Sequence, residues 1–350
     1  MPSRLTVVLV SLLLATPAVA FWLWLVIVPA RVAMLCPEEC ECDRAGYYVE
    51  CNTRSLTAVL LFRFTDVRVL RLPYNQIVLL ENNSSVSLTE LEILELYNCG
   101  LRKIEFGAFN GLTNLTRLVL AGNSISEIIP GIFGCMNILE HLELRQNRLE
   151  HLDTGVFSGL FNLKYIDLST NGFKYLHPDT FLVSPNLQNL NLDSNRGLHV
   201  PTDRNFINSK PLSSLSIHFC SISSLSVETF SNVSSLEKLY LGNNNLSTVD
   251  IKILTAFPKL SELRLYGNRL QCDCQLQEVW RWCEDRNIHT GTRRKVPHCY
   301  TPTEVERMCW GVLESGQCLE GNIEYCGDYR NRTCNFSANR GTRKETMLGF

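Results

Sequence analysis

A pattern of 11 residues recurs along most of this chain and limits what the chain can fold into. The copy LTRLVLAGNSI at Leu115–Ile125 has leucine at positions 1, 4 and 6, asparagine at position 9 and isoleucine at position 11. Successive copies are 24 residues apart, except for one step of 25. The nine copies begin at Val67, Leu91, Leu115, Leu139, Leu163, Leu187, Leu212, Leu236 and Leu260. Self-similarity at a fixed period is a property of stacked repeat structures, so it decides the architecture before local propensities are considered.

The alternation within each copy predicts one short strand per repeat. Leu118 and Leu120 are two residues apart and point to one face, whereas Arg117, Val119 and Ala121 point to the other. A single rung cannot bury its leucines, but stacked rungs bury a continuous core whose ends must be covered. Period and pattern together are those of a leucine-rich repeat solenoid. We therefore predict an α/β fold, a curved horseshoe with a parallel β-sheet on the concave face, an irregular or 3-10 convex side, and disulfide-bonded caps at both ends.

Two further ladders are expected inside the solenoid. The position-9 side chain turns the chain, and its amide can satisfy backbone groups of adjacent turns. It is Asn75, Asn123, Asn147, Asn171, Asn195, Asn244 and Asn268 in seven repeats, and Cys99 and Cys220, which we interpret as buried thiols, in the other two. The second ladder is an aromatic spine on the convex side, formed by Phe109, Phe133, Phe157, Phe181, Phe206 and Phe230.

Cysteine usage indicates an oxidising compartment. Of 15 cysteines, 12 stand outside the repeats, in blocks before and after them, which favours disulfide-bonded caps. The net charge of -2 gives no reason to expect nucleic acid as a partner.

The N-terminus has the form of a secretory signal. Leu5–Ala30 contains no charged residue and follows Arg4. We expect cleavage, either after Ala20 or near Ala30 or Ala33, and hence a secreted protein. The alternative is an uncleaved signal anchor that holds the repeats outside the plasma membrane, since the apolar run is long enough to span a bilayer. In that case the N-terminal segment would be the one contact with the membrane.

Seven N-x-S/T sequons agree with this compartment. They begin at Asn82, Asn83, Asn114, Asn232, Asn245, Asn331 and Asn335. The first two overlap, and Asn245 adjoins the ladder residue Asn244, so we expect sugar on some of the seven only.

The cysteines before the repeats follow the spacing C-x3-C-x-C-x8-C, at Cys36, Cys40, Cys42 and Cys51. This resembles the N-terminal cap of extracellular leucine-rich repeat proteins of the slit, Nogo receptor and acid-labile-subunit types. The resemblance implies bonds Cys36–Cys42 and Cys40–Cys51, among three pairings that spacing leaves open. A zinc site is the alternative, which we reject because a secreted chain oxidises such cysteines and no histidine lies among them.

The residues after the last repeat resemble the C-terminal cap of the same families, with a C-x-C directly after the repeat, a tryptophan-rich turn and a later Cys-x-x-Pro. The resemblance implies bonds Cys272–Cys299 and Cys274–Cys318. Two cysteines exceed that pattern, and we expect them to form a third bond, Cys283–Cys309. A small loop closed by Cys326–Cys334 would leave Cys99, Cys135 and Cys220 unpaired. For Cys135 we favour a buried thiol, and the alternative is an intermolecular disulfide in a homo-dimer.

These features divide the chain into five parts. We expect a signal peptide or signal anchor at 1–33, the N-terminal cap at 36–66, nine repeats at 67–270, the C-terminal cap at 271–318 and a polar, mobile tail at 319–350.

Motifs that carry chemistry are lacking. Asp167–Gly172 looks like the start of a calcium loop, but Pro178 stands where a bidentate glutamate is needed. No G-x-S-x-G, H-E-x-x-H, phosphate loop or dinucleotide fingerprint occurs, and the seven histidines show no ligand spacing. We therefore predict no enzyme activity, no cofactor and no metal.

What remains is the concave face, the extended binding surface of solenoid proteins. Positions 3, 5 and 7 of each repeat point into it. Tyrosine and arginine, the residue types enriched at binding hot spots, occur there in two groups. The first group mixes charge with an aromatic residue and is Arg117, His141, Glu143, Arg145, Tyr165, Asp167 and Asp193. The second group lies near the C-terminal cap and is Tyr240, Arg264 and Tyr266. The predicted partner-binding residues are Tyr97, Arg117, His141, Glu143, Arg145, Tyr165, Asp167, Asp193, His218, Tyr240, Arg264 and Tyr266.

The predicted function is recognition or adhesion, with an extracellular protein as the ligand or receptor. The alternative is an innate-immune pattern receptor that binds microbial glycans or lipids. The families with such caps include guidance factors, carriers, adhesion molecules and immune receptors, so the resemblance itself does not choose among these roles.

Overall fold

The computed structural model describes residues 36–38, 40–43, 47–52, 55–59, 66–291, 296–301, 303, 306, 308, 310–319 and 322–325. Several sequence predictions fall outside these residues. They are the N-terminal apolar segment, the Cys326–Cys334 bond, the sequons Asn331 and Asn335, and the end of the polar tail.

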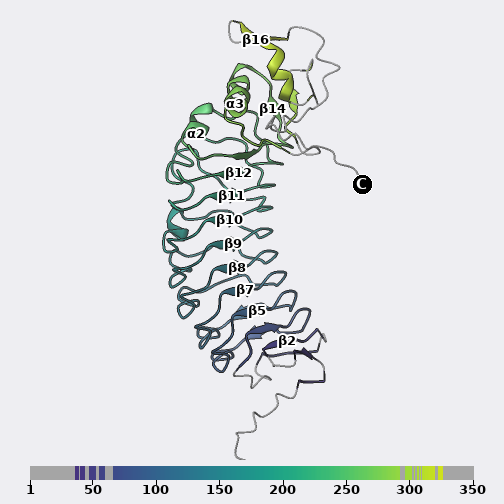
Figure 1. Ribbon diagram of the computed structural model, residues 1–350, viewed down its shortest axis with the longest axis vertical. Coiled ribbons are helices and arrows are strands. Elements are labelled where there is room, and N and C mark those ends of the chain that lie inside the picture. The colour runs from purple at the N-terminus through teal and green to yellow at the C-terminus, as the bar shows by residue number, and fades with distance from the viewer. Residues whose placement is uncertain are drawn as a thin grey trace, which may run out of the picture.

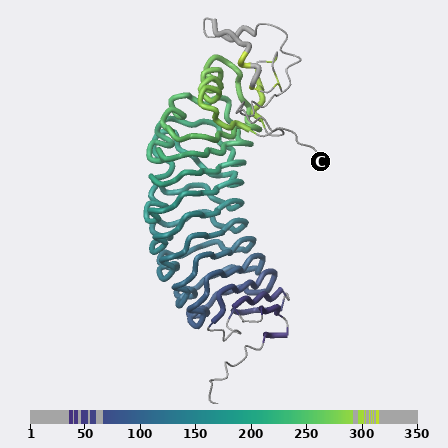
Figure 2. The backbone as a smooth tube through the Cα atoms, in the orientation of Figure 1, coloured from purple at the N-terminus to yellow at the C-terminus, as the bar shows by residue number. Residues whose placement is uncertain are grey.

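The fold is a curved stack of rungs, each contributing one strand to a single sheet of 11 strands (Figure 1). In sheet order the strands are β1 (Glu41–Cys42), β2 (Tyr48–Glu50), β3 (Val69–Arg71), β5 (Ile93–Glu95), β7 (Arg117–Val119), β8 (His141–Glu143), β9 (Tyr165–Asp167), β10 (Asn189–Asn191), β11 (Ser214–Ser216), β12 (Lys238–Tyr240) and β13 (Glu262–Arg264). The backbone tube shows the same stack as one bent column (Figure 2). The predicted solenoid with its parallel sheet is confirmed.

All strands from β2 to β13 pair in parallel, and the register of each pair joins equivalent repeat positions. Arg117 of β7, for example, lies opposite His141 of β8, which in turn lies opposite Tyr165 of β9. This register is possible because the repeat length is constant. The longer step before Leu212 leaves the pairing of β10 with β11 intact, with Asn189 opposite Ser214.

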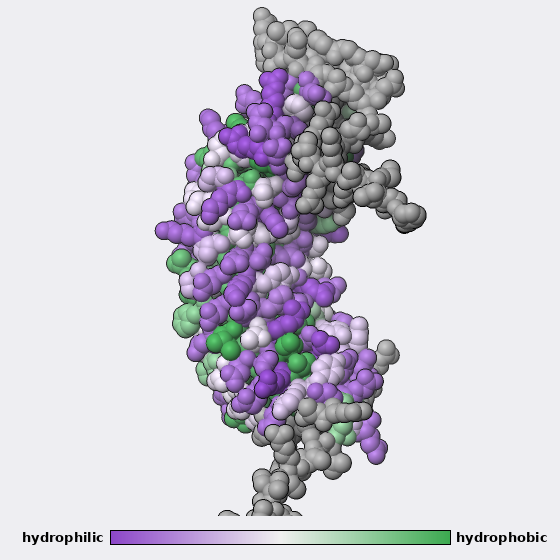
Figure 3. Space-filling view, viewed as in Figure 1, coloured by the Kyte–Doolittle hydropathy of each residue, from purple (hydrophilic) through white to green (hydrophobic). Residues whose placement is uncertain are grey.

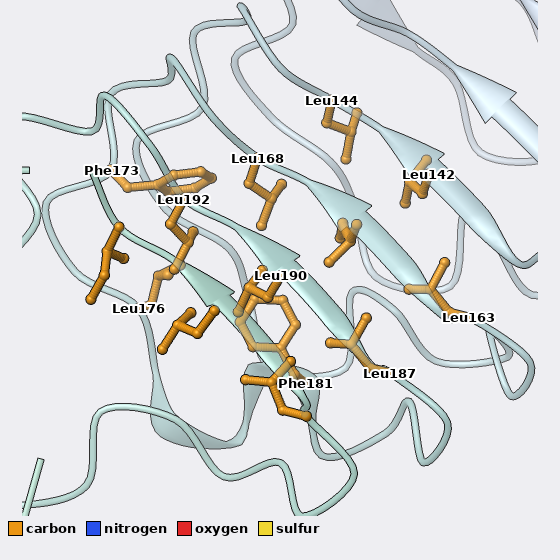
Figure 4. Close-up of a cluster of buried hydrophobic side chains, with 14 of the residues drawn as sticks. Leu142, Leu144, Leu163, Leu168, Phe173, Leu176, Phe181, Leu187, Leu190 and Leu192 are labelled. Atoms are coloured by element: carbon orange, nitrogen blue, oxygen red, sulfur yellow. The ribbon is translucent and has the colours of Figure 1, made fainter. Parts of the chain in front are cut away.

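The core lies between the sheet and the convex loops. In each strand the central residue points inward, as Leu142 and Leu190 do, while Leu144 and Leu192 continue the same face two residues later (Figure 4). All four are at most 2 % exposed. Burial of such a side chain contributes about 1.5–3 kcal/mol, and the stacking of rungs repeats that contribution along the solenoid.

The predicted aromatic spine closes the core on the convex side. Phe109, Phe133, Phe157 and Phe181 are stacked, with ring centroids 5.7–6.4 Å apart. Phe206 and Phe230 are also buried, and Phe230 meets Phe257 edge-on at 6.0 Å.

The position-9 ladder is also confirmed. The Asn123 side chain donates to the carbonyl of Leu96 at 2.8 Å and accepts from the N–H groups of Cys99 and Leu101 at 2.9 and 3.0 Å. The Cys99 thiol stands in the same place one rung earlier and donates to the Leu72 carbonyl at 3.0 Å. Cysteine therefore replaces the donor half of the asparagine ladder.

The convex side is built mainly of turns, with four short elements. They are β4 (Leu79–Leu80), β6 (Lys103–Ile104), the 3-10 helix η1 (Pro178–Phe181) and the helix α2 (Ile251–Thr255). The sequence predicted irregular or 3-10 structure here. The exceptions are the two-stranded parallel sheet of β4 and β6 and the helix α2. Asp250 begins this helix, because its side chain accepts from the Lys252 N–H at 2.8 Å.

The N-terminal cap extends the sheet. Its hairpin pairs β1 with β2 in antiparallel fashion, and β2 continues in parallel onto β3. Disulfides join Cys36 to Cys42 and Cys40 to Cys51, as the family resemblance implied. The hairpin thereby covers the leucines that the first repeat would otherwise expose.

The C-terminal cap contains α3 (Cys274–Asp285), β14 (Leu270–Gln271), β15 (Cys299–Thr301), the 3-10 helix η3 (Trp310–Ser315), β16 (Gly316–Leu319) and β17 (Asn322–Tyr325). Asp273 begins α3 by accepting from the Leu276 N–H at 3.0 Å. The helix covers the last rung through Leu276 and Val279, which are fully buried.

Two of the predicted C-terminal pairings can be compared with the structure. The Cys272–Cys299 bond is present, and Cys274 is disulfide-bonded, although the side chain of its expected partner Cys318 lies outside the described part. The predicted Cys283–Cys309 bond is wrong, because Cys283 is a free thiol. It lies 1 % exposed on the inner side of α3, where burial raises its pKa to about 12, so it packs as a small apolar side chain.

Candidate functional site

The concave face presents three columns of side chains that run along the sheet. The central residue of each strand points into the core, so the residues on either side of it point to the opposite face. The first and last residues of the strands form the first and second columns, and a third column lies two residues further on. Along β7 to β13 the first column is Arg117, His141, Tyr165, Asn189, Ser214, Lys238 and Glu262, the second is Val119, Glu143, Asp167, Asn191, Ser216, Tyr240 and Arg264, and the third is Ala121, Arg145, Ser169, Asp193, His218, Gly242 and Tyr266.

Alternating charges form a continuous network over the first rungs. The Nε atom of Arg71 lies 3.2 Å from Glu95 Oε2. Arg117 lies between two acids, with Nε 3.8 Å from Glu95 Oε1 and Nη2 2.6 Å from Glu143 Oε1. Val119 occupies the second column between these glutamates. Since valine is apolar, the first-column arginine supplies the charge that separates them.

Glu143 is the most heavily partnered acid of this network. Besides Arg117, it lies 2.9 Å from His141 Nε2 and 3.3 Å from Arg145 Nε. The hydrogen bond from His141 holds the pKa of Glu143 below its ordinary value, and the charge of Arg117 and the bond from Arg145 act in the same direction, against burial. Glu143 is therefore held as a carboxylate.

An aromatic pair adjoins this network. The rings of His141 and Tyr165 stack at 4.2 Å between centroids, with 9° between their planes. The Tyr165 hydroxyl lies 3.4 Å from Asp167 Oδ2. Burial, together with the charges of Asp167 and Glu143, raises the pKa of Tyr165 to about 12, so the phenol stays protonated.

A second aromatic cluster lies on the last rungs. His218 lies between two tyrosines, with ring centroids 5.8 Å from Tyr240 and 5.4 Å from Tyr266. Tyr240 donates to Glu262 Oε2 at 2.8 Å, and Arg264 Nε binds the other oxygen of that carboxylate at 2.7 Å. Three rings and one ion pair thus form a continuous surface next to the C-terminal cap.

Gly242 makes this cluster possible. A Cβ atom at this position would lie 2.8 Å from His218 Nδ1 and 2.9 Å from Tyr266 Cζ. Any larger residue would therefore push the two rings apart.

Asp193 connects the middle rungs to this second cluster. Its Oδ1 accepts from the Ser216 hydroxyl at 2.6 Å and from the His218 backbone N–H at 2.7 Å. From its sequence position we placed Asp193 with the charged group around Glu143, but its contacts are with the aromatic cluster.

Comparison with known proteins identifies the repeats. The leucine rich repeat family profile matches residues 89–149, 139–196 and 210–270. These stretches of the chain are leucine-rich repeats.

The trophoblast glycoprotein of Macaca fascicularis is 28% identical to the chain over 265 residues, which cover 74% of this chain and 62% of that protein. The chain thus matches somewhat less than two thirds of the length of this curated relative. The crystal structure of human 5T4, also called trophoblast glycoprotein, has a TM-score of 0.56 at 24% identity and covers 79% of this chain and 95% of its own. A chain of the mouse RP105/MD-1 complex has a TM-score of 0.57 at 21% identity, covering 73% of this chain and 48% of its own. At these identities the two solved structures support the fold.

The structure brings the predicted face residues of these repeats together in two groups. Arg117, His141, Glu143, Arg145 and Tyr165 are in mutual contact or one contact apart, with Asp167 beside them. His218, Tyr240, Arg264 and Tyr266 form the other group with Asp193. Tyr97 belongs to neither and meets Tyr74 edge-on at 5.4 Å.

Several members of these groups were missed by sequence reasoning. Arg71 occupies position 5 of the first repeat, which the face assignment omitted although the same rule applied to it. Tyr48 and Glu50 lie in the cap strand β2, opposite Val69 and Arg71, so they extend the first and second columns. No repeat signal marks that strand, and it could not have been found in this way.

The five predicted sequons within the described residues lie away from the three columns. The side chains of Asn82, Asn83, Asn114, Asn232 and Asn245 are exposed. None of the five asparagines is itself a member of the three columns.

Metal binding, membrane spanning and thiol reactivity can be checked in the part of the chain that the structure describes. Within that part no three of His, Cys, Asp and Glu are grouped so that they could hold a metal ion, and none of its helices is long and apolar enough to cross a membrane. The half-buried Cys135 thiol donates to the Phe109 carbonyl at 3.1 Å, and burial raises its pKa. A raised pKa makes the thiol less reactive at neutral pH.

Proposed function

We propose that this protein is a non-catalytic recognition protein that binds an extracellular protein ligand through its concave face. One observation carries the proposal: the face holds ordered charged and aromatic side chains that stay accessible. The side chains of Arg117, His141 and Arg145 are 36%, 27% and 44% exposed although each is fixed by contacts with its neighbours. Such pre-organised side chains lose little entropy on binding.

The chemistry of the face favours a protein as the ligand. Tyrosine and arginine dominate both groups, and these residues combine apolar contact area with hydrogen bonding. In the space-filling view the surface is largely hydrophilic, and apolar residues form scattered patches (Figure 3). Because both groups consist of charged, polar and aromatic side chains, a ligand of the concave face would make mainly polar and aromatic contacts.

The mouse RP105/MD-1 complex gives a precedent for ligand binding by this fold. It contains a chain of similar structure together with a second protein, and by analogy we extend protein binding to this chain.

The covalent chemistry supports an extracellular location. Three disulfides with defined partners, all in the caps, need an oxidising compartment. The apolar segment Leu5–Ala30 supplies the route of export. We propose release by cleavage of that segment, and a protein recovered from the medium that still begins at Met1 would contradict release.

The test of the function is a binding screen with the full chain produced by secretory cells. The tagged protein is offered an array of extracellular proteins and, in parallel, lipopolysaccharide, peptidoglycan and glucan. We expect saturable binding to a protein. Binding to the microbial glycans or lipids alone would contradict the proposal and favour a pattern receptor.

A further inference from the structure

The middle of the concave face differs from both ends in the size of its side chains. The concave-face residues of β10 and β11 are short and polar, as are Asp167 in the second column of β9 and Asp193 in the third column. We call this the acidic patch, which consists of Asp167, Asn189, Asn191, Asp193, Ser214 and Ser216. The rings of Tyr165 and Tyr240 stand on either side of it, on β9 and β12. Strands are about 4.8 Å apart, so the two rings are about 14 Å apart along the sheet.

The patch also differs in its electrostatics. Elsewhere on the face each carboxylate is neutralised by the face itself: Glu95 binds Arg71 and Arg117, Glu143 binds Arg117 and Arg145, and Glu262 binds Arg264. Asp167 and Asp193 are the exceptions, since neither forms an ion pair among the residues that the structure describes. Two cations border the patch. Lys238 is exposed and lies in the first column opposite Ser214, whereas the two aspartates lie in the second and third columns. Arg145, on the side of β8, is already paired with Glu143.

Both aspartates are nonetheless held in place. Asp167 is 5% exposed, and its Oδ1 accepts from the Ser169 N–H at 2.9 Å. Asp193 is fixed by Ser216 and by the His218 N–H. A carboxylate removed from water without a counter-ion is costly, and here the protein itself supplies only neutral donors. The arrangement is suited to a cation that comes from outside.

The neighbouring rings fit the same ligand. His141 covers one face of the Tyr165 ring from the β8 side. Because the rings stack along the direction in which the strands succeed one another, the other face of Tyr165 is turned toward β10 and the patch. The electron-rich face of an aromatic ring attracts a guanidinium or ammonium group. Carboxylates flanked by aromatic rings therefore favour arginine or lysine over an acidic or neutral group.

We propose that the acidic patch is the specificity-determining part of the concave face and that it receives an arginine- or lysine-bearing segment of the protein ligand. This inference rests on the proposed function and adds the charge of the ligand to it. The network around Glu143 still contributes ordered contacts to the ligand, but its charges are already paired. The selection of a basic partner therefore falls to the unpaired charges of Asp167 and Asp193.

The test uses the full secreted chain and fluorescein-labelled nona-arginine, with nona-glutamate for comparison, in fluorescence anisotropy at physiological salt. The variant Asp167→Ser/Asp193→Asn keeps a side-chain oxygen at each position that can accept from the Ser169 and His218 N–H groups, and it creates no N-x-S/T sequon. The matched control is Asp153→Asn/Asp203→Asn, which removes the same charge from two exposed acids outside the columns. Thermal unfolding verifies that both variants are folded.

We expect nona-arginine to bind the natural protein and the control within twofold of each other, and the patch variant at least tenfold more weakly, with nona-glutamate not binding. Equal weakening in both variants, or no binding of nona-arginine at all, would overturn the proposal. Competition by 1 mM calcium that the patch variant abolishes would also overturn it, because the patch would then be a site for a divalent ion. The proposed function is tested separately: it survives a failed patch if a protein found in the screen still binds and is lost on substitution around Glu143.

Discussion

Arg117 and Glu143 lie on adjacent strands, β7 and β8, with Nη2 and Oε1 2.6 Å apart. Arg117 also lies near Glu95 on its other side, so one guanidinium separates two carboxylates across a rung that has valine in the second column.

Replacing this arginine should therefore cost more than removing an ordinary surface charge. Arg117→Met keeps the apolar stem but leaves Glu95 and Glu143, whose side chains are 14% and 13% exposed, without their shared cation. We expect the free energy of unfolding to fall by about 1–2 kcal/mol in urea titrations. Lys174→Met removes an exposed partner of Glu150 and should leave the midpoint unchanged. Equal effects of the two substitutions would show that the network is not cooperative.

The same network should make stability depend on pH. The pKa of Glu143 is lowered in the folded protein from a reference value of 4.5. A carboxyl with a depressed folded pKa contributes stability above its unfolded pKa and loses that contribution as the pH falls through the folded one. Below about pH 4.5 the unfolding free energy of the natural protein should thus decrease more steeply than that of Glu143→Gln. Parallel curves from pH 7 to pH 3 would contradict this assignment.

Gly242→Ala should disturb the aromatic cluster with little effect on the fold. The new methyl group would lie within 3.0 Å of the rings of His218 and Tyr266, both of which are partly exposed and can move. We expect an unfolding free energy within about 1 kcal/mol of the natural protein. The upfield ring-current shift of the His218 protons in NMR spectra should disappear. An unchanged His218 spectrum would mean that the rings are not packed over Gly242.

Cys99→Asn should stabilise the solenoid. The thiol supplies only the donor that binds the Leu72 carbonyl, whereas Asn123 supplies a donor and an acceptor in the equivalent place. A further buried hydrogen bond contributes about 1 kcal/mol, which would raise the urea midpoint. Cys99→Ser, which adds no amide, is the control and should not raise it. A lower midpoint for the asparagine variant would show that the cavity around Cys99 is too small for an amide.

The repeated core could be predicted from the sequence, whereas the contacts between side chains on the concave face could not. The strands, the position-9 ladder and the phenylalanine spine followed from spacing, because a constant repeat forces equivalent residues into equivalent contacts. The columns of the concave face followed from alternation along a strand. The sequence did not show which long side chains are in contact. Arg117 could have paired with Glu95 or with Glu143, and it lies close to both.

Two sequence predictions were wrong because sequence position alone does not show what a side chain contacts. Asp193 was grouped with Glu143 by its rung and its charge, but a carboxylate on a short stem binds what lies beside its own backbone, here Ser216 and the His218 N–H. We predicted a bond between Cys283 and Cys309 because these two cysteines exceed the four-cysteine pattern of the family. The position of Cys283 on the inner face of α3 makes it part of the core instead, and helix phase was the signal that could have shown this.

The central claim, that the concave face binds a protein ligand, is tested most directly by the Kd of a ligand identified in the screen. The face variant combines Glu143→Gln, Arg145→Gln, Tyr165→Leu and Asp167→Ser, none of which creates an N-x-S/T sequon. The control combines Glu150→Gln and Lys174→Gln, an exposed pair outside the three columns. We predict that the face variant, verified as folded by circular dichroism, binds at least tenfold more weakly than the natural protein, while the control stays within twofold. An unchanged Kd for the folded face variant would contradict the account.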